Sequence, residues 1–185
     1  MKKVVNYILL CGVLVLSLTG CGKNKVEEAQ KDFQVSVEKY GTVEKENIET
    51  LVAKFNTEVK NNSTLNPAST DYLTEDNGEY WYSLIDGIYL VVVPENYTGD
   101  KTEVVNYTLL YVKKSSKYES DATSYIKYLI KANNSEITDV EIDALINDAK
   151  EKVNSGNTAN NGKGIKIGYT ESDDVYQYQV LRLYL

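Results

Sequence analysis

The sequence predicts an α+β fold, with an antiparallel sheet of about five strands and three helices packed on one face. Segments whose apolar residues recur every three or four positions alternate with segments whose apolar residues recur every second position, the periods of helices and strands. Two pairs of strand segments are joined by turns of two and four residues, which favour antiparallel pairing. The expected order is α-β-β-β-α-α-β-β, in a single domain over residues 41–185.

The first helix is expected from Ile48. Five apolar residues share one of its faces at spacings of three and four: Ile48, Leu51, Val52, Phe55 and Val59. The polar residues 61–63 and the later Pro67 end it.

Three strands follow the first helix. Residues 80–85 and 88–93 are β-branched and aromatic runs joined by Asp86 and Gly87, a signal for a tight hairpin. Residues 103–112 alternate between two sides of the third strand. One side carries Val105, Tyr107, Leu109 and Tyr111, and the other carries Asn106 and Thr108. This alternation predicts that the first side is buried and the second is wetter.

Two helices and a hairpin complete the chain. The apolar face of the first helix is Tyr125, Ile126, Leu129 and Ile130. The second begins with a capping box, Thr138 and Glu141, and its apolar stripe is Ile142, Leu145, Ile146, Ala149 and Val153. Residues 154–164, rich in Asn and Gly, predict a mobile loop that buries nothing, and residues 165–170 and 175–185 form the last hairpin.

Residues 1–20 have the composition of an export signal. Two lysines open the segment, an apolar run extends from Ile8 to Leu18, and Gly20 closes it. The run is shorter than the roughly 20 residues that span a bilayer as a helix. An ordinary cleavage site of the A-x-A type is also disfavoured, because no alanine precedes Ala29.

The stretch Leu18-Thr19-Gly20-Cys21 resembles the lipobox of bacterial lipoproteins. The resemblance implies that residues 1–20 are a lipoprotein signal peptide and that Cys21 carries a diacylglyceryl group. Two acyl chains hold a protein on a bilayer, so the chain is expected on the extracytoplasmic face of the cell membrane. Residues 21–40 are then a polar tether, although the alternation around 33–37 leaves an edge strand open there.

The mature part is similar in outline to small exported α+β lipoprotein domains, including inhibitor-type and cystatin-like folds. The likeness rests on the order of elements, and a shared fold does not imply a shared function.

Composition excludes several classes of function. The chain has no histidine, which excludes Ser-His-Asp and Cys-His catalysis and His-ligated zinc. Loss of residues 1–20 removes two of the 20 basic residues and none of the 27 acidic residues, so the mature chain is strongly acidic. A nucleic-acid partner is not expected, because binding to phosphates needs basic patches. Cys11 lies in the signal peptide and Cys21 carries the lipid, so no disulfide is expected.

Tyrosine is the dominant aromatic residue, with 16 in the chain against two Phe and one Trp. One interpretation is that Tyr replaces Phe in the core. The other is a recognition face on the side of the sheet without helices, which binds an envelope protein or peptide or, as the alternative, a cell-wall glycan. Its candidate residues are Tyr80, Trp81, Tyr82, Tyr107, Tyr111, Tyr176, Tyr178 and Tyr184. Strand alternation places Trp81 on the opposite face from Tyr80. Trp81 is then either an exposed contact residue or a residue that anchors the core.

Catalysis, a cofactor and a metal site are not expected. A carboxylate-based hydrolase is the less favoured alternative, with candidate acids at strand ends: Glu79, Asp86, Asp173 and Asp174. The acids at 139, 141 and 143 point in different directions on a helix and cannot surround one ion. The acidic stretch ESDD at 171–174 is the better cation candidate of the two. "NGKG" at 161–164 lacks the strand and helix of a phosphate-binding loop.

Overall fold

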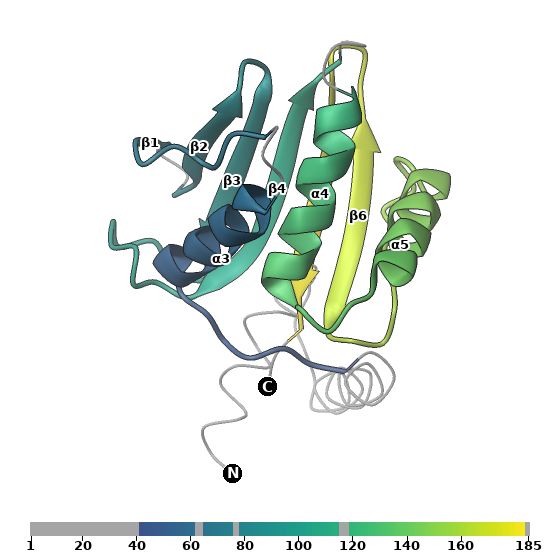
Figure 1. The fold of residues 1–185 in the computed structure, drawn as a ribbon, viewed down its shortest axis with the longest axis horizontal. Coiled ribbons are helices and arrows are strands. Elements are labelled where there is room, and N and C mark those ends of the chain that lie inside the picture. Colours follow the sequence, from purple (N-terminus) through teal and green to yellow (C-terminus); the bar gives the residue numbers. More distant parts are fainter. Residues whose placement is uncertain (1–40, 62–64, 76–77, 115–118, 184–185) are drawn as a thin grey trace, which may run out of the picture.

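A computed structural model describes residues 41–61, 65–75, 78–114 and 119–183 (Figure 1). These residues form two layers, a seven-stranded antiparallel sheet and three helices on one of its faces. The expected α+β class is confirmed, but the sheet has two strands more than expected. Cys21, the segment 33–37 and Tyr184 lie outside the described residues, so what was predicted for them stays a prediction.

The sheet has the order β1-β2-β3-β4-β7-β6-β5, and each adjacent pair is antiparallel. Its strands are β1 (Tyr72–Thr74), β2 (Tyr80–Ile85), β3 (Ile88–Pro94), β4 (Val105–Lys113), β5 (Ala159–Asn160), β6 (Ile165–Glu171) and β7 (Val175–Arg182). The helices are α3 (Ile48–Lys60), α4 (Glu119–Asn133) and α5 (Asp139–Glu151). After β4 the chain passes through α4 and α5, and β7 returns to pair with β4.

Local signals in the sequence fix several element ends. Asn47 caps α3 by accepting a hydrogen bond from the Thr50 backbone N–H at 2.8 Å. The capping box of α5 is confirmed, because Thr138 and Glu141 each accept from the other's backbone N–H. The hairpin between β2 and β3 is also confirmed, with Gly87 in the left-handed region at φ 86°.

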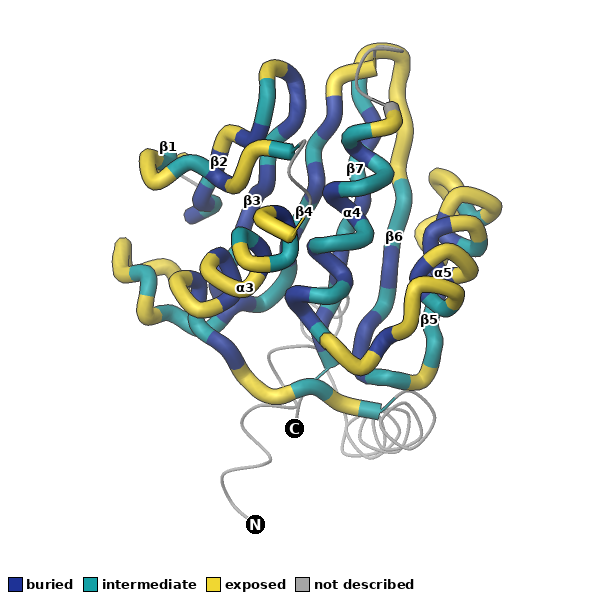
Figure 2. Tube along the Cα trace, viewed as in Figure 1, coloured by how far each residue is buried: buried dark blue, intermediate teal, exposed yellow. Residues whose placement is uncertain are grey.

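The core lies between the sheet and its helices. One row of paired residues crosses the sheet from Tyr82 through Leu90 and Leu110 to Tyr178, and all four are buried. From the helical layer, Phe55 of α3 and Tyr125 of α4 pack on each other with ring centroids 6.2 Å apart. Figure 2 shows the resulting pattern, with the outward turns of α3 and α5 exposed.

From Tyr107 to Tyr111 the faces of β4 are the reverse of the prediction, whereas Val105 is buried as predicted and pairs with Pro94 beyond a register shift. Thr108 is fully buried on the side of the helices, whereas Tyr107 and Tyr111 are half-buried on the opposite side. Pairing gives the reason, because Leu110 lies between the core residues Leu90 and Tyr178. An alternating pattern shows that a strand has two faces, but not which one meets the helices.

The segment 154–164 is more ordered than predicted. Ala159 is fully buried and, with Asn160, forms the edge strand β5 against β6. The prediction that this loop buries nothing was therefore wrong. The residue just before the loop also differs from the prediction: Val153, expected in the apolar stripe of α5, lies beyond the end of that helix and is 39% exposed.

Candidate functional site

The sheet face opposite the three helices carries a band of apolar side chains across β1 to β4. We call this band the open face, and its members are Leu73, Trp81, Tyr89, Val91, Val93, Tyr107, Leu109 and Tyr111. Register brings them together, since Val91, itself fully buried, pairs with Trp81 on one side and with Leu109 on the other. Leu73, paired with Trp81 on the edge strand, is 71% exposed.

Three rings form the centre of the open face. Trp81 lies 5.9 Å from Tyr89 and 5.4 Å from Tyr111, centroid to centroid, and the two tyrosines are 6.2 Å apart. Their planes cross at 61–63°, the edge-to-face arrangement that aromatic quadrupoles favour. Each ring therefore supports the other two, and all three remain half-buried rather than buried.

A carboxylate lies beside this ring cluster. The Trp81 indole N–H donates a hydrogen bond to Glu79 Oε2 at 3.0 Å. Glu79 directly precedes β2 and Trp81 is the second residue of that strand, so the two side chains share a face. Burial, and then the negative charge of Glu79, raise the pKa of the Tyr107 hydroxyl. The acidic group thus sits at one end of the open face, between Trp81 and Tyr107.

Polar side chains continue the same face on β7 and β6. Gln179 pairs with Leu109 on one side and with Gly168 on the other. A Cβ at Gly168 would contact the Gln179 side chain at 3.6–3.7 Å, which is ordinary van der Waals distance. Beyond β4, the open face is thus bordered by the Gln179 amide and by the half-buried Leu181, which pairs with Tyr107.

The structure separates the eight predicted binding residues. It brings Trp81, Tyr107 and Tyr111 together on the open face. Four others are buried on the helical side and cannot contact a partner there: Tyr80, Tyr82, Tyr176 and Tyr178. Their alternation along β2 and β7 is the physical reason, because residues two apart share a face and that face meets the helices.

Sequence reasoning missed five members of the open face: Leu73, Tyr89, Val91, Val93 and Leu109. The signal for Tyr89 was available in the hairpin, since a two-residue turn at Asp86 and Gly87 fixes the register of β2 on β3. Leu73 carried no signal, because β1 is only three residues long.

The edges of the sheet are short and partly capped. β1 has three residues and β5 two, and the Ser69 N–H donates to the Ser83 carbonyl of β2. On β6, the Asn154 side chain bonds to both the N–H and the carbonyl of Glu171. Such edges offer little backbone for an added strand.

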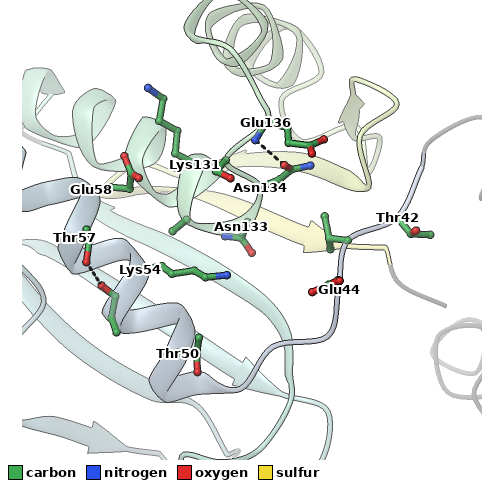
Figure 3. A pocket seen from close by; sticks show the side chains of 14 residues that line it. Thr42, Glu44, Thr50, Lys54, Thr57, Glu58, Lys131, Asn133, Asn134 and Glu136 are labelled. Carbon is green, nitrogen blue, oxygen red and sulfur yellow. Dashed lines mark hydrogen bonds between the residues drawn. The ribbon is translucent and has the colours of Figure 1, made fainter.

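A cavity of about 660 Å³ lies on the helical side, between α3, the end of α4 and residues 42–44 (Figure 3). A smaller one of about 350 Å³ adjoins it and reaches Arg182. Thr, Asn, Lys and Glu side chains dominate both linings, and Lys54 and Glu44 extend into the space.

The buried charges of Arg182 and Glu46 line the smaller cavity. Arg182 donates from Nη1 to Glu46 Oε2 at 3.2 Å and to Asn133 Oδ1 at 2.9 Å, and from Nη2 to the Glu44 carbonyl at 2.8 Å. Glu46 also pairs with Lys54 at 2.6 Å. This network joins the segment before α3 to the last strand, so its evident role is structural.

The acids proposed for catalysis or cation binding are dispersed. Asp86 lies in the turn after β2, whereas Glu79 precedes that strand, so they are about 20 Å apart along its six residues. Asp173 and Asp174 are exposed, and Glu171 pairs with Lys114 at 2.7 Å. Within the described ranges, no three His, Cys, Asp or Glu residues are grouped so as to hold a metal ion.

Comparison of the chain with protein-family models, curated proteins and solved structures finds no match in any of the three. Among the helices of the described segments, none is both long and apolar enough to cross a membrane. The open face and the polar cavities are thus the features from which a function is argued.

Proposed function

We propose that this chain is a non-catalytic binding protein of the cell envelope that recognises a protein or peptide through the open face. The observation that carries the proposal is the cluster of Trp81, Tyr89 and Tyr111 on the side of the sheet away from the described helices. Trp and Tyr dominate the energetic centres of protein interfaces, because they bury much area with few rotatable bonds.

The shape of the cluster favours a protein partner over a sugar. The planes of the three rings cross at 61–63°, so the cluster presents ring edges as well as faces and not one flat platform. A sugar is bound best on a flat aromatic platform, whereas a protein surface can bury edges and faces together. The short, capped sheet edges also favour docking on the face over addition of a strand.

A cell-wall glycan is the second candidate, and Glu79 is the observation that favours it. A carboxylate beside Trp81 can accept hydrogen bonds from sugar hydroxyls, and Gln179 continues the same surface. Sedimentation with purified peptidoglycan separates the two candidates. Retention that is lost in Trp81→Ala would favour the glycan.

Location is part of the same proposal. A lipid on Cys21 places the domain outside the cytoplasm, where its partner must also reside. Cys21→Ser is expected to leave an unprocessed precursor or to release the protein from membranes, as judged by fractionation and mass spectrometry. An unmodified thiol on a mature, membrane-bound chain would contradict the anchor.

Photo-crosslinking in living cells tests the binding proposal. A photoreactive phenylalanine analogue replaces Leu73 on the open face or, as a matched control, Val140 on α5, since both aliphatic side chains are more than 70% exposed. We expect a discrete crosslinked protein at position 73 that disappears with Trp81→Ala. Equal crosslinking at both positions, or none at 73, would contradict a partner on the open face.

A further inference from the structure

We infer that the open face binds an arginine side chain of its partner, with the guanidinium lying against the Trp81 ring and the Glu79 carboxylate. This inference rests on the proposed function and specifies the chemistry of the partner. Its basis is the arrangement of the ring cluster around a fixed acid.

The Glu79 carboxylate is held in a fixed position. Glu79 Oε2 is held 3.0 Å from the Trp81 indole nitrogen, so the charge is fixed at the rim of the ring rather than moving freely in solvent. A fixed carboxylate matches the rigid fork of a guanidinium and can pair with it through charge-assisted hydrogen bonds.

The rings and the acid attract the same charge. The face of an aromatic ring carries negative potential, and Trp is the strongest of the three ring types for a cation. Glu79 adds a full negative charge beside it, and that charge, after burial, also raises the pKa of the neighbouring Tyr107 hydroxyl. A cation at this point is attracted by both the ring and the carboxylate.

Charge is unevenly distributed over this side of the sheet. Lys113 lies on the same side of β4 as Tyr107 but six residues further along, about 20 Å away. Lys166 shares the cross-strand row of Tyr107, because both pair with Leu181, but it lies on β6, four strands and about 19 Å from β2. Glu79 thus makes the β2 end of the open face acidic, and the net charge of −7 over the whole chain also steers a basic partner toward it.

Arginine suits this site better than lysine. Its planar group stacks on a ring while its N–H groups point outward, parallel to the ring, and can reach a carboxylate at the rim. Lysine presents one point charge and cannot satisfy both surfaces in this way. The apolar members of the open face, Val93 and Leu109 among them, then accept the aliphatic neighbours of that arginine.

Intrinsic fluorescence provides the test, because Trp81 is the only tryptophan of the chain. The probes are the peptide acetyl-Leu-Arg-Leu-Arg-Leu-amide and its counterpart with neutral citrulline in place of both arginines. We expect a saturable change in Trp81 emission with the arginine peptide and at least about tenfold weaker binding of the citrulline peptide. Equal binding of the two peptides, or no saturable change, overturns the inference.

Glu79→Gln tests the carboxylate, since its amide oxygen can still accept the Trp81 N–H. The variant is expected to bind the arginine peptide about tenfold more weakly and to bind the citrulline peptide with unchanged affinity. Glu151→Gln, at the end of α5, removes the same charge from an exposed site elsewhere and is expected to change neither affinity by more than about twofold. Equal effects of the two variants overturn the inference.

The crosslinking experiment separates this inference from the proposed function. If position 73 captures a protein and Glu79→Gln does not reduce the yield, the arginine contact is wrong and the binding face stands. If no protein is captured at position 73 in the native host, the proposed function fails as well. Circular dichroism and the unfolding midpoint of Glu79→Gln check that the fold is retained.

Discussion

Arg182 Nη1 lies 3.2 Å from Glu46 Oε2, and this buried ion pair joins two residues 136 positions apart. The side chains are 2% and 6% exposed, so water contributes little to the stability of either charge. The pair ties the segment that enters α3 to the last strand of the sheet.

Removal of one partner is therefore expected to be costly. Glu46→Ala removes the carboxylate that faces the buried Arg182 guanidinium, and we expect a loss of about 3–5 kcal/mol in the free energy of unfolding. Lys54→Met, which removes only the exposed partner of Glu46, is expected to cost less than about 1 kcal/mol. Urea unfolding followed by circular dichroism measures both. Similar losses in the two variants would contradict the assigned role of the buried pair.

Gly164 is expected to tolerate no side chain. Its φ is 75°, and a Cβ would lie 2.7 Å from the Val43 backbone nitrogen, where the first described residues pass over the start of β6. Gly156 has a similar φ of 73° but nothing within 4 Å. We expect Gly156→Ala to cost about 1–2 kcal/mol and Gly164→Ala about 3 kcal/mol or more, measured by urea unfolding. Equal losses would show that only backbone strain matters at both sites.

Acid pH is expected to remove the contribution of Glu141. Hydrogen bonds from the Thr138 backbone, and then from Lys163, lower the pKa of Glu141 from 4.5 to about 2. A folded-state pKa below the unfolded value means that the stabilisation is complete above pH 4.5 and is lost as the pH falls toward 2. The difference in unfolding free energy between the wild type and Glu141→Gln should shrink over this range. A difference that is constant from pH 6 to about pH 2 would contradict the capping box as its source.

Alkaline pH is expected to destabilise the fold through buried tyrosines. Burial raises the pKa of Tyr82 and of Tyr125 from 10.0 to about 12, and it also raises the pKa of Tyr80 and Tyr178. Because these folded-state values exceed the unfolded one, stability is complete below pH 10 and falls as the pH rises toward 12. Tyr82→Phe should lessen this loss of unfolding free energy, and the part that comes from the other buried tyrosines should remain. Unfolding curves at pH 9, 10 and 11 measure the loss in the variant and in the wild type. Equal losses in the two proteins would contradict the role of Tyr82.

Local signals predicted the elements well. The capping box at Thr138 and the turn at Asp86 and Gly87 act within a few residues, so the sequence contains all that determines them. The edge strands β1 and β5 were not predicted, because strands of three and two residues show no period and form only against a neighbour.

The candidate site was only partly predictable, for a different reason. Alternation separated Trp81 from Tyr80 correctly, yet it could not show which of them meets the helices. The same limit reversed the two faces of β4, where Thr108 is buried and Tyr111 is half-buried on the open face. The position of a helix over a sheet depends on the whole chain, and a strand pattern carries no information about it.

Residues at both limits of the described chain meet at one end of the sheet. The Val43 N–H donates to the Leu183 carbonyl at 2.7 Å, and the turn at Asp86 and Gly87 lies at the opposite end (Figure 1). If Cys21 holds the lipid, the twenty residues up to Gly41 can extend by at most about 70 Å. The tether would then join the domain at the end of the sheet that carries Val43 and Leu183, opposite the turn at Asp86 and Gly87.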